Sequence, residues 1–409
     1  MKVARINLSI ENSQDVQLLE GDVIELRTER VANGGFCVGR HNGQAVFVRH
    51  SLPGELVRAE ITEINKRFLR ANVVEVLEAN SARNEPKCSY AGVCGGCDWQ
   101  HSTLEYQREL KSQVVIEQLS HLAGLTELNG KPIQDFKVDP LPGESDGLHW
   151  RTRNRYAKIG DIGIGMKMAR SHSVVEIDNC EIAVPGSVDL ALSALHLAGD
   201  EISTVQSSSG QHVVVDKRGG PWLEERVSNR KWRIHASSFW QVHKNAPETF
   251  VKTVHEFSNL HPKDTLLDLY AGSGLFAANL AGDVGETGSV VAVESSVDAV
   301  RDARRSCSDL PQLELVTADV ARWLNGSDEQ FTVVVLDPPR AGAGLNVINR
   351  IAQIAQKAIV YVACDPSALG RDAKYLAEAG WTLQKIVAFD AFPMTSHVEC
   401  IAKFVPTRS

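Results

Sequence analysis

The sequence predicts an α/β protein whose last third is a doubly wound, largely parallel sheet and whose N-terminal region is a small β-barrel. Two observations predict this fold class. Apolar runs alternate with helical segments from residue 265 onward, which is typical of a parallel sheet covered on both faces. Short runs rich in Val, Ile, Leu and Phe, separated by Gly, Asn and Pro, fill residues 16–78 and favour a barrel.

Length and composition indicate several domains in one globular chain. A chain of 409 residues with 43% hydrophobic content is too long for one core, so we expect two or three domains. No apolar segment reaches the ~18 residues of a membrane span, and the N-terminus does not resemble a signal peptide. We therefore expect a cytoplasmic protein with no membrane partner. The 8 cysteines are too sparse for a disulfide scaffold, so their clustering favours metal binding or catalysis.

Two basic stretches stand out against the net charge of −8, which argues against bulk binding of polyanions. Residues 40–70 hold six basic and three acidic side chains, and residues 150–173 hold six basic side chains against Asp161 alone. The second stretch includes Arg151, Arg153 and Arg155. Such runs are either solvated faces or contacts to phosphates, and the sequence leaves both interpretations open.

The predicted barrel has five strands, over residues 23–26, 35–39, 45–48, 56–61 and 71–76. Barrels of the oligonucleotide-binding kind hold nucleic acid with exposed basic and aromatic side chains, which suits the basic residues between 40 and 70. A structural or protein-binding barrel is the alternative.

A group of cysteines follows the barrel. Cys88, Cys94 and Cys97 lie within ten residues, and two glycines between them let the backbone wrap closely around a ligand. Cys180, the next cysteine in the chain, is the natural fourth ligand. Four thiolates suit zinc or a cubane iron-sulfur cluster, and the spacing does not separate these. Next, Ser102 and Glu105 form a capping box that predicts a helix over 102–123, ending near Gly124.

The last third opens with a strand, a glycine turn and a helix, in the sequence DLYAGSGLF of residues 268–276. Glu294 ends the next strand, where an acid can bind both ribose hydroxyls of a nucleotide-like ligand, and Asp319 ends a third strand and could meet an adenine. Ala277 replaces the third glycine of a dinucleotide turn, which favours S-adenosylmethionine over NAD. The candidate cofactor contacts in this region are Asp268, Tyr270, Gly272, Gly274, Glu294, Asp319 and Asp337.

The fourth and fifth strands end in Asp337 and Cys364, so these two residues flank one crevice at the carboxyl edge of the sheet. A lone cysteine ending a buried strand is ordinarily an inert small hydrophobe, but this position makes Cys364 a candidate nucleophile. A final strand begins near Glu399, an acid among apolar residues. That setting predicts a raised pKa and a general-base role.

These residues resemble the RNA uridine carbon-5 methyltransferases, specifically the ribosomal-RNA type that carries a TRAM barrel and a four-cysteine iron-sulfur cluster. The resemblance covers nearly the whole chain and rests on CSYAGVCGGC with the later Cys180, SFWQV, DLYAGSGLF, LDPPRAGAG, YVACDP and FPMTSHVE. It implies S-adenosylmethionine as cofactor, a [4Fe-4S] cluster on Cys88, Cys94, Cys97 and Cys180, and a monomer that methylates RNA, preferably 23S ribosomal RNA.

The resemblance also implies roles and domains. Cys364 would add to carbon 6 of uracil, Glu399 would remove the carbon-5 proton, and Asp337 would contact the target base. Phe239 and Gln241 would be active-site and cofactor contacts, and the predicted RNA contacts are Phe239, Arg340, Arg151, Arg153 and Arg155. We expect a TRAM barrel over 1–80, a small central α+β iron-sulfur domain over 81–238, whose helix 102–123 packs on the catalytic domain, and a Rossmann-like methyltransferase domain over 239–409.

Related activities fit less well. Cytosine carbon-5 enzymes that use two cysteines place one just after the fourth strand, where this chain has none. Amino-nitrogen methyltransferases favour an aromatic residue where Arg340 stands. The alternatives that stay open are a transfer-RNA uridine carbon-5 methyltransferase and a non-catalytic, redox-sensing iron-sulfur protein that binds RNA.

Overall fold

The computed structural model describes residues 18–143, 145–216 and 219–407. The chain divides into two compact units. The first comprises the residues up to Val114, with Lys167–Ser173 and Pro393–Ser396; the second comprises Val115–Met166, Val174–Phe392 and His397–Ser409. Among the residues described, no helix is both long and apolar enough to cross a membrane.

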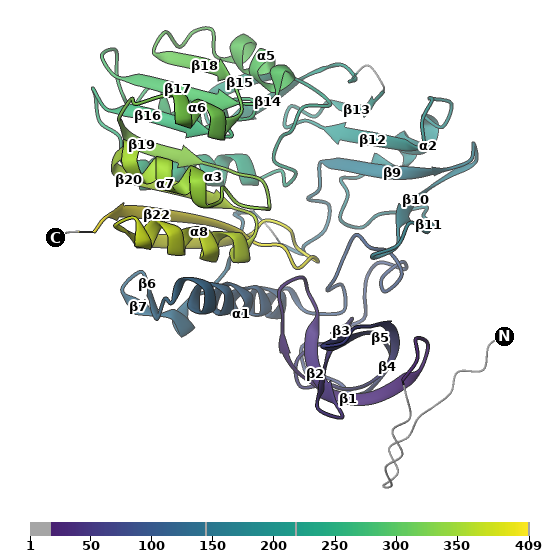
Figure 1. Ribbon diagram of the computed structural model, residues 1–409. Coiled ribbons are helices and arrows are strands. Elements are labelled where there is room, and N and C mark those ends of the chain that lie inside the picture. The colour runs from purple at the N-terminus through teal and green to yellow at the C-terminus, as the bar shows by residue number, and fades with distance from the viewer. Residues whose placement is uncertain (1–17, 144, 217–218, 408–409) are drawn as a thin grey trace. The chain divides into compact units, whose positions relative to one another are not determined.

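The first unit contains the predicted barrel, which is closed in the order β1-β2-β3-β5-β4 (Figure 1). Alternation along the strands builds its core: Val46 and Val48 are fully buried, whereas Phe47 between them is half-buried. The strands are β1 (Val23–Val31), β2 (Cys37–His41), β3 (Gln44–Arg49), β4 (Leu56–Ile64) and β5 (Phe68–Glu78). The prediction of a five-stranded barrel is therefore confirmed.

The segment Pro393–Ser396 belongs to the first unit because backbone hydrogen bonds tie it to residues beyond the cysteine loop. The amides of Asp98 and Trp99 both donate to the carbonyl of Met394, over 2.9 and 3.0 Å. The amide of Ser396 donates to Oδ2 of Asp98 over 2.9 Å. Hydrogen bonds thus join two segments that lie almost 300 positions apart in the sequence.

Helix α1 (Leu104–Ala123) confirms the predicted helix, but its cap lies one residue later than the predicted box. The amide of Gln107 donates to the carbonyl of Thr103 over 2.9 Å, which makes Thr103 the capping residue. Its Oγ1 accepts a bond from the amide of Tyr106 over 3.4 Å. The capping box on Ser102 and Glu105 was therefore wrong, because the first helical hydrogen bond begins at Thr103.

The second unit contains smaller sheets before its main sheet. A five-stranded sheet has the order β11-β10-β9-β12-β13, and β14 and β15 form a two-stranded ribbon. The strands are β9 (Arg153–Ile159), β10 (Gly163–Lys167), β11 (Val174–Glu176), β12 (Glu201–Gln206), β13 (His212–Val215), β14 (Trp222–Val227) and β15 (Arg230–His235), with α2 (Ser187–Ser193) beside them. The hairpin β6 (Glu127–Leu128) and β7 (Lys131–Pro132) and the short helix η1 (Ile133–Asp135) follow α1.

The main sheet has eight strands in the order β18-β17-β16-β19-β20-β22-β21-β8. Its strands are β8 (Asp139–Pro140), β16 (Thr265–Leu269), β17 (Ser289–Glu294), β18 (Leu313–Thr317), β19 (Phe331–Leu336), β20 (Ala355–Ala363), β21 (Trp381–Asp390) and β22 (Glu399–Pro406). The run from β18 to β20 is parallel, and β22 is antiparallel to β20. The predicted doubly wound sheet is confirmed.

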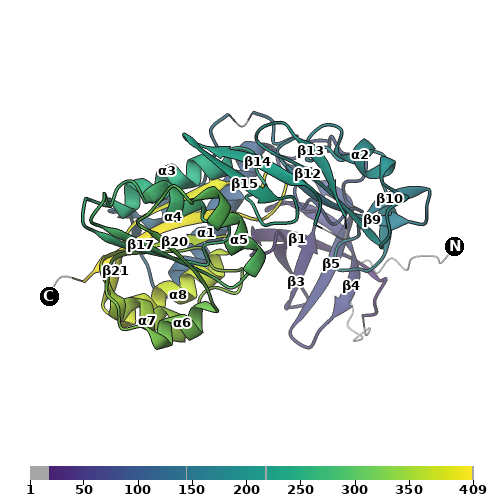
Figure 2. The same ribbon diagram turned by 90° about the horizontal axis from the view of Figure 1, so that it is seen from above.

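Helices cover both faces of this sheet (Figures 1 and 2). Alternate residues of each strand enter two separate cores: Val333 and Val335 pack with α3 and α4, whereas Val334 and Leu336 pack with α6, α7 and α8. The helices are α3 (Ala246–Ser258), α4 (Leu275–Leu280), α5 (Val297–Ser306), α6 (Val320–Gly326), α7 (Leu345–Ile354) and α8 (Pro366–Glu378). The face of the sheet on which a residue at a strand tip lies can therefore be inferred by counting in steps of two from the buried residues of that strand.

Candidate active site at the strand tips

Strand pairing brings Cys364 and Glu399 together. In the antiparallel pair of β20 and β22, Ala363 lies opposite Cys400, so the next step of the register sets Cys364 opposite Glu399. Val362 and Ile401, two residues inward from each, both belong to the core beneath α3 and α4. The two side chains therefore share that face of the sheet.

Asp337 reaches the same face from the neighbouring strand. It follows Leu336, the last residue of β19, and two residues earlier Val335 enters the core beneath α3 and α4. Its amide donates to the carbonyl of Leu269 at the end of β16 over 3.3 Å. The three predicted catalytic residues thus come from three strand tips at one edge of the sheet, where ligands of such sheets collect.

Burial and mutual repulsion keep protons on this group. Burial, followed by the charges of Glu399 and Asp337, raises the pKa of the Cys364 thiol to about 12. Burial and then Asp337 raise the pKa of Glu399, which is 3% exposed, well above its usual range. Burial raises the pKa of Asp337 to about 7. At neutral pH Cys364 is therefore a thiol and Asp337 is partly ionised, and the raised pKa of Glu399 favours its protonated form.

Arg340 is the cation that opposes these shifts. Its positive charge lowers the pKa of both Cys364 and Glu399, although burial outweighs it in each case. The guanidinium is exposed, and its Nη2 lies 3.0 Å from Nε2 of His397. An arginine can only donate, so His397 accepts at Nε2 and is neutral in this arrangement. His397 thereby orients the one arginine that favours the thiolate.

Asp372 fixes the loop that follows Arg340. Its Oδ2 accepts hydrogen bonds from the amides of Ala343 and Gly344, over 2.7 and 3.3 Å, and from the hydroxyl of Tyr361 over 2.8 Å. Asp372 lies on α8 and is fully buried. Beside it, Nη2 of Arg371 donates to the carbonyl of Ala341 over 2.5 Å. The loop after Asp337 and Arg340 is therefore held at several consecutive residues.

A small pocket, here called the strand-tip pocket, lies beside the catalytic group. Its lining residues come from the SFWQV segment, the glycine turn, the start of α4 and the residue after β19: Phe239, Trp240, Gln241, Tyr270, Ala271, Gly272, Ser273, Leu275, Phe276 and Asp337. The turn is tight, because Tyr270, Gly272 and Gly274 all adopt positive φ, at 60°, 55° and 83°. Such a turn lets backbone amides approach a ligand closely. The predicted cofactor residues Gln241, Tyr270, Gly272 and Asp337 thus meet in one pocket.

The remaining predicted cofactor acids support this turn or stand near it. Glu294, at the end of β17, accepts a bond from the amide of Gly272 over 3.0 Å. Asp268 is fully buried and accepts from the amide of Ala277 over 2.9 Å, and burial raises its pKa to about 8. Its Oδ1 has no hydrogen-bond partner. Asp319 is exposed and caps α6, since its Oδ1 accepts from the amide of Arg322 over 2.9 Å.

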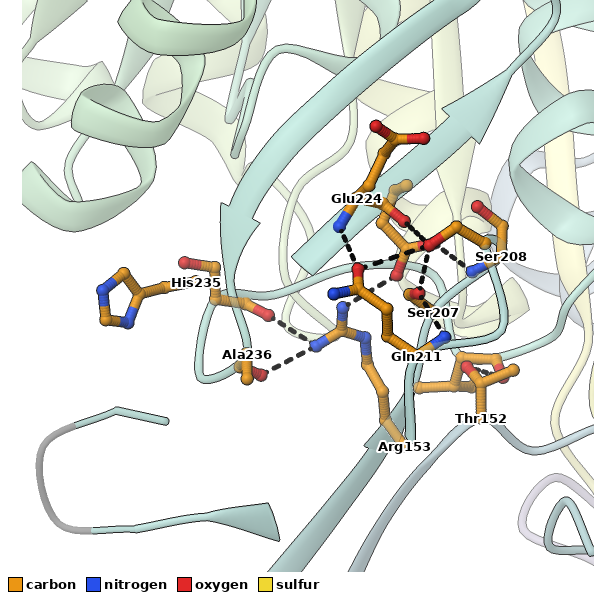
Figure 3. A network of polar contacts seen from close by, with 12 residues as sticks. Thr152, Arg153, Ser207, Ser208, Gln211, Glu224, His235 and Ala236 are labelled. Carbon is orange, nitrogen blue, oxygen red and sulfur yellow. Dashed lines mark hydrogen bonds and ion pairs between the residues drawn. The ribbon is translucent and has the colours of Figure 1, made fainter. Parts of the chain in front are cut away.

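The predicted RNA contacts divide into exposed and buried residues. The Phe239 side chain is 68% exposed at the pocket, and the Arg155 side chain is 72% exposed. Arg153 differs, because its side chain is 12% exposed and forms an ion pair with Glu225 over 3.2 Å (Figure 3). Nε of Arg151 donates to the carbonyl of Arg153 over 3.2 Å. In the structure, the Arg153 side chain binds other residues inside the protein, which differs from its predicted contact to RNA.

The described residues show no metal site at the cysteines that were predicted to bind a cluster. Cys88, Cys94 and Cys97 belong to the first unit and Cys180 to the second. Within the described residues, no group of three or more His, Cys, Asp or Glu is placed to hold a metal ion. The loop does suit thiolate ligands, since the amide of Gly96 lies 3.3 Å from Sγ of Cys94 and the side-chain amide of Gln100 lies 3.5 Å from Sγ of Cys97.

Sequence reasoning missed His397 and Asp372. His397 stands in the segment FPMTSHVE, two residues before Glu399 and on the same face of the strand by parity, which could have indicated it. Asp372 lies within a helix and has no local motif. Its function depends on a loop some thirty residues earlier in the chain.

Comparison with known proteins identifies the architecture. Residues 17–74 match the TRAM domain, and residues 189–404 match the tRNA (uracil-5-)-methyltransferase family. The fold resembles the Pyrococcus abyssi tRNA (uracil-54, C5)-methyltransferase in complex with S-adenosyl-L-homocysteine. That match has a TM-score of 0.71 and 23% identity, and covers 93% of this chain and 99% of the other.

Relatives of similar length extend the match over almost the whole chain. An RNA methyltransferase of Streptomyces avermitilis is 37% identical, with coverage of 94% of this chain and 99% of the relative. The 23S rRNA (uracil(1939)-C(5))-methyltransferase of Acinetobacter baylyi is 31% identical, with 89% of each chain covered. The chain therefore belongs to the RNA (uracil-5-)-methyltransferases that use S-adenosylmethionine, and it carries a TRAM domain.

Proposed function

We propose that this enzyme methylates carbon 5 of one uridine in 23S ribosomal RNA through a covalent adduct on Cys364. The carrying observation is the strand-tip group, in which register sets Cys364 opposite Glu399 and Asp337 stands on the adjacent tip. The choice of ribosomal RNA is supported by the Acinetobacter baylyi relative, whose name specifies uracil 1939 of 23S rRNA.

The first step is attack by the Cys364 sulfur on carbon 6 of uracil. A bond forms between Sγ and carbon 6, and the ring electrons move toward the carbonyl at carbon 4 as an enolate, which makes carbon 5 nucleophilic. The thiol proton must leave for this step. Asp337 is the better acceptor, since its pKa of about 7 leaves part of it ionised at neutral pH.

Methyl transfer and release complete the cycle. S-adenosylmethionine would supply the methyl group, which the carbon-5 electron pair takes as the sulfur–methyl bond breaks and S-adenosylhomocysteine is left. Glu399, having lost its own proton to solvent, removes the proton from carbon 5. The electron pair of that bond rebuilds the double bond between carbons 5 and 6, and the Cys364 sulfur departs and recovers its proton. One proton is released overall.

The residues of the strand-tip pocket fit the cofactor. Backbone at positive φ in the glycine turn allows close approach, and Glu294 at the end of β17 offers carboxylate oxygens near the turn. Buried beneath the turn, Asp268 has an unpartnered Oδ1. We infer that these groups hold the adenosine and amino-acid portions of S-adenosylmethionine, which leaves the Asp337 edge of the pocket for the reacting methyl group.

Transfer of tritium from labelled S-adenosylmethionine to RNA tests the proposal. Ribosomal RNA should accept label, and Cys364→Ala should abolish transfer, whereas Cys37→Ala, which removes a buried thiol in strand β2 of the barrel, should preserve it. If only transfer RNA accepts the label, the proposed substrate is wrong and transfer RNA takes the place of ribosomal RNA. Full transfer by Cys364→Ala would sink the covalent mechanism.

The base is tested separately. Glu399→Gln cannot accept the carbon-5 proton, so a methylated adduct on Cys364 should accumulate and appear as a protein–RNA band on a denaturing gel. Wild-type enzyme should show such a band only with 5-fluorouridine RNA, where fluorine replaces the proton. Turnover by Glu399→Gln at the wild-type rate would assign the base elsewhere.

We also propose that Cys88, Cys94, Cys97 and Cys180 hold a [4Fe-4S] cluster. Support comes from their spacing and from the N–H groups beside the sulfurs of Cys94 and Cys97. Protein purified without oxygen should be brown and contain about four iron atoms per chain. Colourless protein that contains zinc would overturn this proposal and leave the methyltransferase proposal intact.

A further inference from the structure

Two consecutive residues hold both ends of the segment that carries Phe239. The amide and the Oγ1 of Thr152 both donate to the carbonyl of Val242, over 2.8 and 2.9 Å. Nη1 of Arg153 donates to the carbonyls of Ala236 and Ser238, each over 3.0 Å. The chain between Ser238 and Val242 is therefore tied at each end to one short stretch at the start of β9.

A buried acid fixes Arg153 in turn. Nη2 of Arg153 donates to Oε1 of Glu225 on β14, and Oε2 of Glu225 accepts from the amide of Ser208 over 2.8 Å (Figure 3). The Glu225 side chain is 4% exposed and that of Arg153 12% exposed. Water therefore competes little for these bonds, and the guanidinium can serve one carboxylate and two carbonyls because its donors form a planar fork.

A second acid holds the same segment from α5. Oδ2 of Asp302, which is fully buried, accepts from the hydroxyl of Ser238 over 2.5 Å and from the amide of His235 over 2.9 Å. Ser238 is thus fixed at its carbonyl by Arg153 and at its hydroxyl by Asp302. One residue later, the Phe239 side chain is 68% exposed.

The fixed backbone around Phe239 presents an exposed aromatic ring beside the strand-tip pocket, which suits contact with a ligand. We propose that Thr152, Arg153 and Glu225 are positioning residues, which hold Phe239 at the mouth of the strand-tip pocket in the conformation that meets the extruded target base. This inference rests on the proposed RNA methylation. Fixing the segment before RNA arrives removes an ordering cost from the binding step.

Amide hydrogen exchange tests the physical part without any reaction. Arg153→Lys keeps the charge but cannot reach two carbonyls and Glu225 together, so the peptide spanning residues 235–242 should exchange faster than in wild type. Arg226→Lys is the matched control, because Arg226 pairs with Glu224 on the same strand and its side chain is 55% exposed. Equal exchange in wild type and Arg153→Lys would overturn the inference.

A double-mutant cycle tests the functional part. Arg153→Lys and Phe239→Ala should each lower kcat/KM for RNA by about tenfold to 100-fold, and the double variant should be no worse than Phe239→Ala alone. If the loss of kcat/KM in the double variant equals the product of the two single losses, or if Phe239→Ala shows no loss, the inference is overturned. Thr152→Val, which loses one hydroxyl and keeps its shape, should show a smaller defect with the same dependence on Phe239 and guards against a misfolded Arg153 variant.

The two hypotheses fail in different ways. If wild-type protein transfers no methyl group to RNA, the proposed function fails, while the exchange experiment still decides whether Arg153 holds the segment. If transfer is normal and the Arg153→Lys defect persists in the Phe239→Ala background, the positioning inference fails alone.

Discussion

At the residue scale, Cys364, the proposed nucleophile, lies near acidic side chains whose negative charges disfavour the thiolate. Glu399 and Asp337 raise the pKa of Cys364, whereas the positive charge of Arg340 lowers it. A resting thiol is protected from oxidants and metals, since the thiolate is the reactive form. Binding of a base and a cationic sulfonium would change this balance when the substrates are present.

Arg340→Gln should shift the pH dependence of adduct formation to higher pH. Arg340 lowers the pKa of both Cys364 and Glu399, so its removal raises both, and each group then ionises only at higher pH. The rate of trapping by 5-fluorouridine RNA, measured from pH 6 to 10, should rise with pH in both proteins, later in the variant. An unshifted profile would show that Arg340 does not act on the thiol.

Asp372→Asn should loosen the loop after Arg340. The carboxylate accepts three bonds at one oxygen, and an amide would place an NH2 group beside Arg371, whose Nε lies 3.4 Å from Oδ1. We expect a loss of about 1–3 kcal/mol in unfolding free energy, measured in urea, with slower adduct formation. Tyr361→Phe, which removes only one of the three donors, should lose less; an equal loss would contradict the shared-acceptor account.

The positions of the proposed catalytic residues were predictable, because strand tips are recognisable from apolar runs and the order of strands in a parallel sheet is constrained. Cys364, Asp337 and Glu399 all lie where the runs placed them. Arg153 was not predictable, since a basic stretch gives no sign of a buried acid such as Glu225, some seventy residues later. Local charge counts do not distinguish a solvated arginine from a buried one.

At the element scale, α8 begins two residues after Cys364, at Pro366. Asp365 caps it, with Oδ1 accepting from the amides of Ser367 and Ala368 over 2.8 and 3.0 Å. This cap fixes where β20 ends and therefore where Cys364 turns out of the strand. Sequence patterns located such elements well but misplaced their ends: the third strand stops at Thr317, and Asp319 caps α6 instead of ending the strand.

Asp365→Ala and Asp365→Asn should separate the cap from the charge. Alanine removes both hydrogen bonds and should lower the unfolding free energy by about 0.5–2 kcal/mol, whereas asparagine also caps well and should be nearly neutral. Both remove a negative charge that raises the pKa of Cys364, so both should ease thiolate formation slightly. Urea unfolding and the trapping rate measure these effects; equal destabilisation by both variants would exclude capping.

At the scale of the whole molecule, the chain crosses between its two units more often than a linear domain map suggests. Lys167–Ser173 and Pro393–Ser396 join the first unit although both are flanked by residues of the second. No local pattern predicts this, because it arises from contacts such as those of Asp98 and Trp99 with Met394. Fold class followed from periodicity, whereas this interleaving required the three-dimensional structure.

Asp268→Asn should change how global stability depends on pH. The folded protein holds a proton on Asp268 up to a pKa of about 8, whereas the unfolded chain loses it near 3.8. Between these values the folded state binds more protons, so this group's stabilisation falls as pH rises. In ligand-free protein, the variant should lose less stability between pH 5 and 8 than wild type. Parallel stability curves for the two proteins would refute the raised pKa.

The pairing of β20 with β22 fixes the distance between the two residues proposed as nucleophile and base. Because Cys364 directly follows β20 and Glu399 begins the paired strand β22, the spacing of the sheet sets the separation of their backbones. Insertions between β21 and β22 would therefore change which RNA the enzyme recognises and leave the geometry of the proposed catalytic residues unchanged. A shift of the β22 register by one residue would instead turn Glu399 to the opposite face of the sheet, and the enzyme would be folded but inactive.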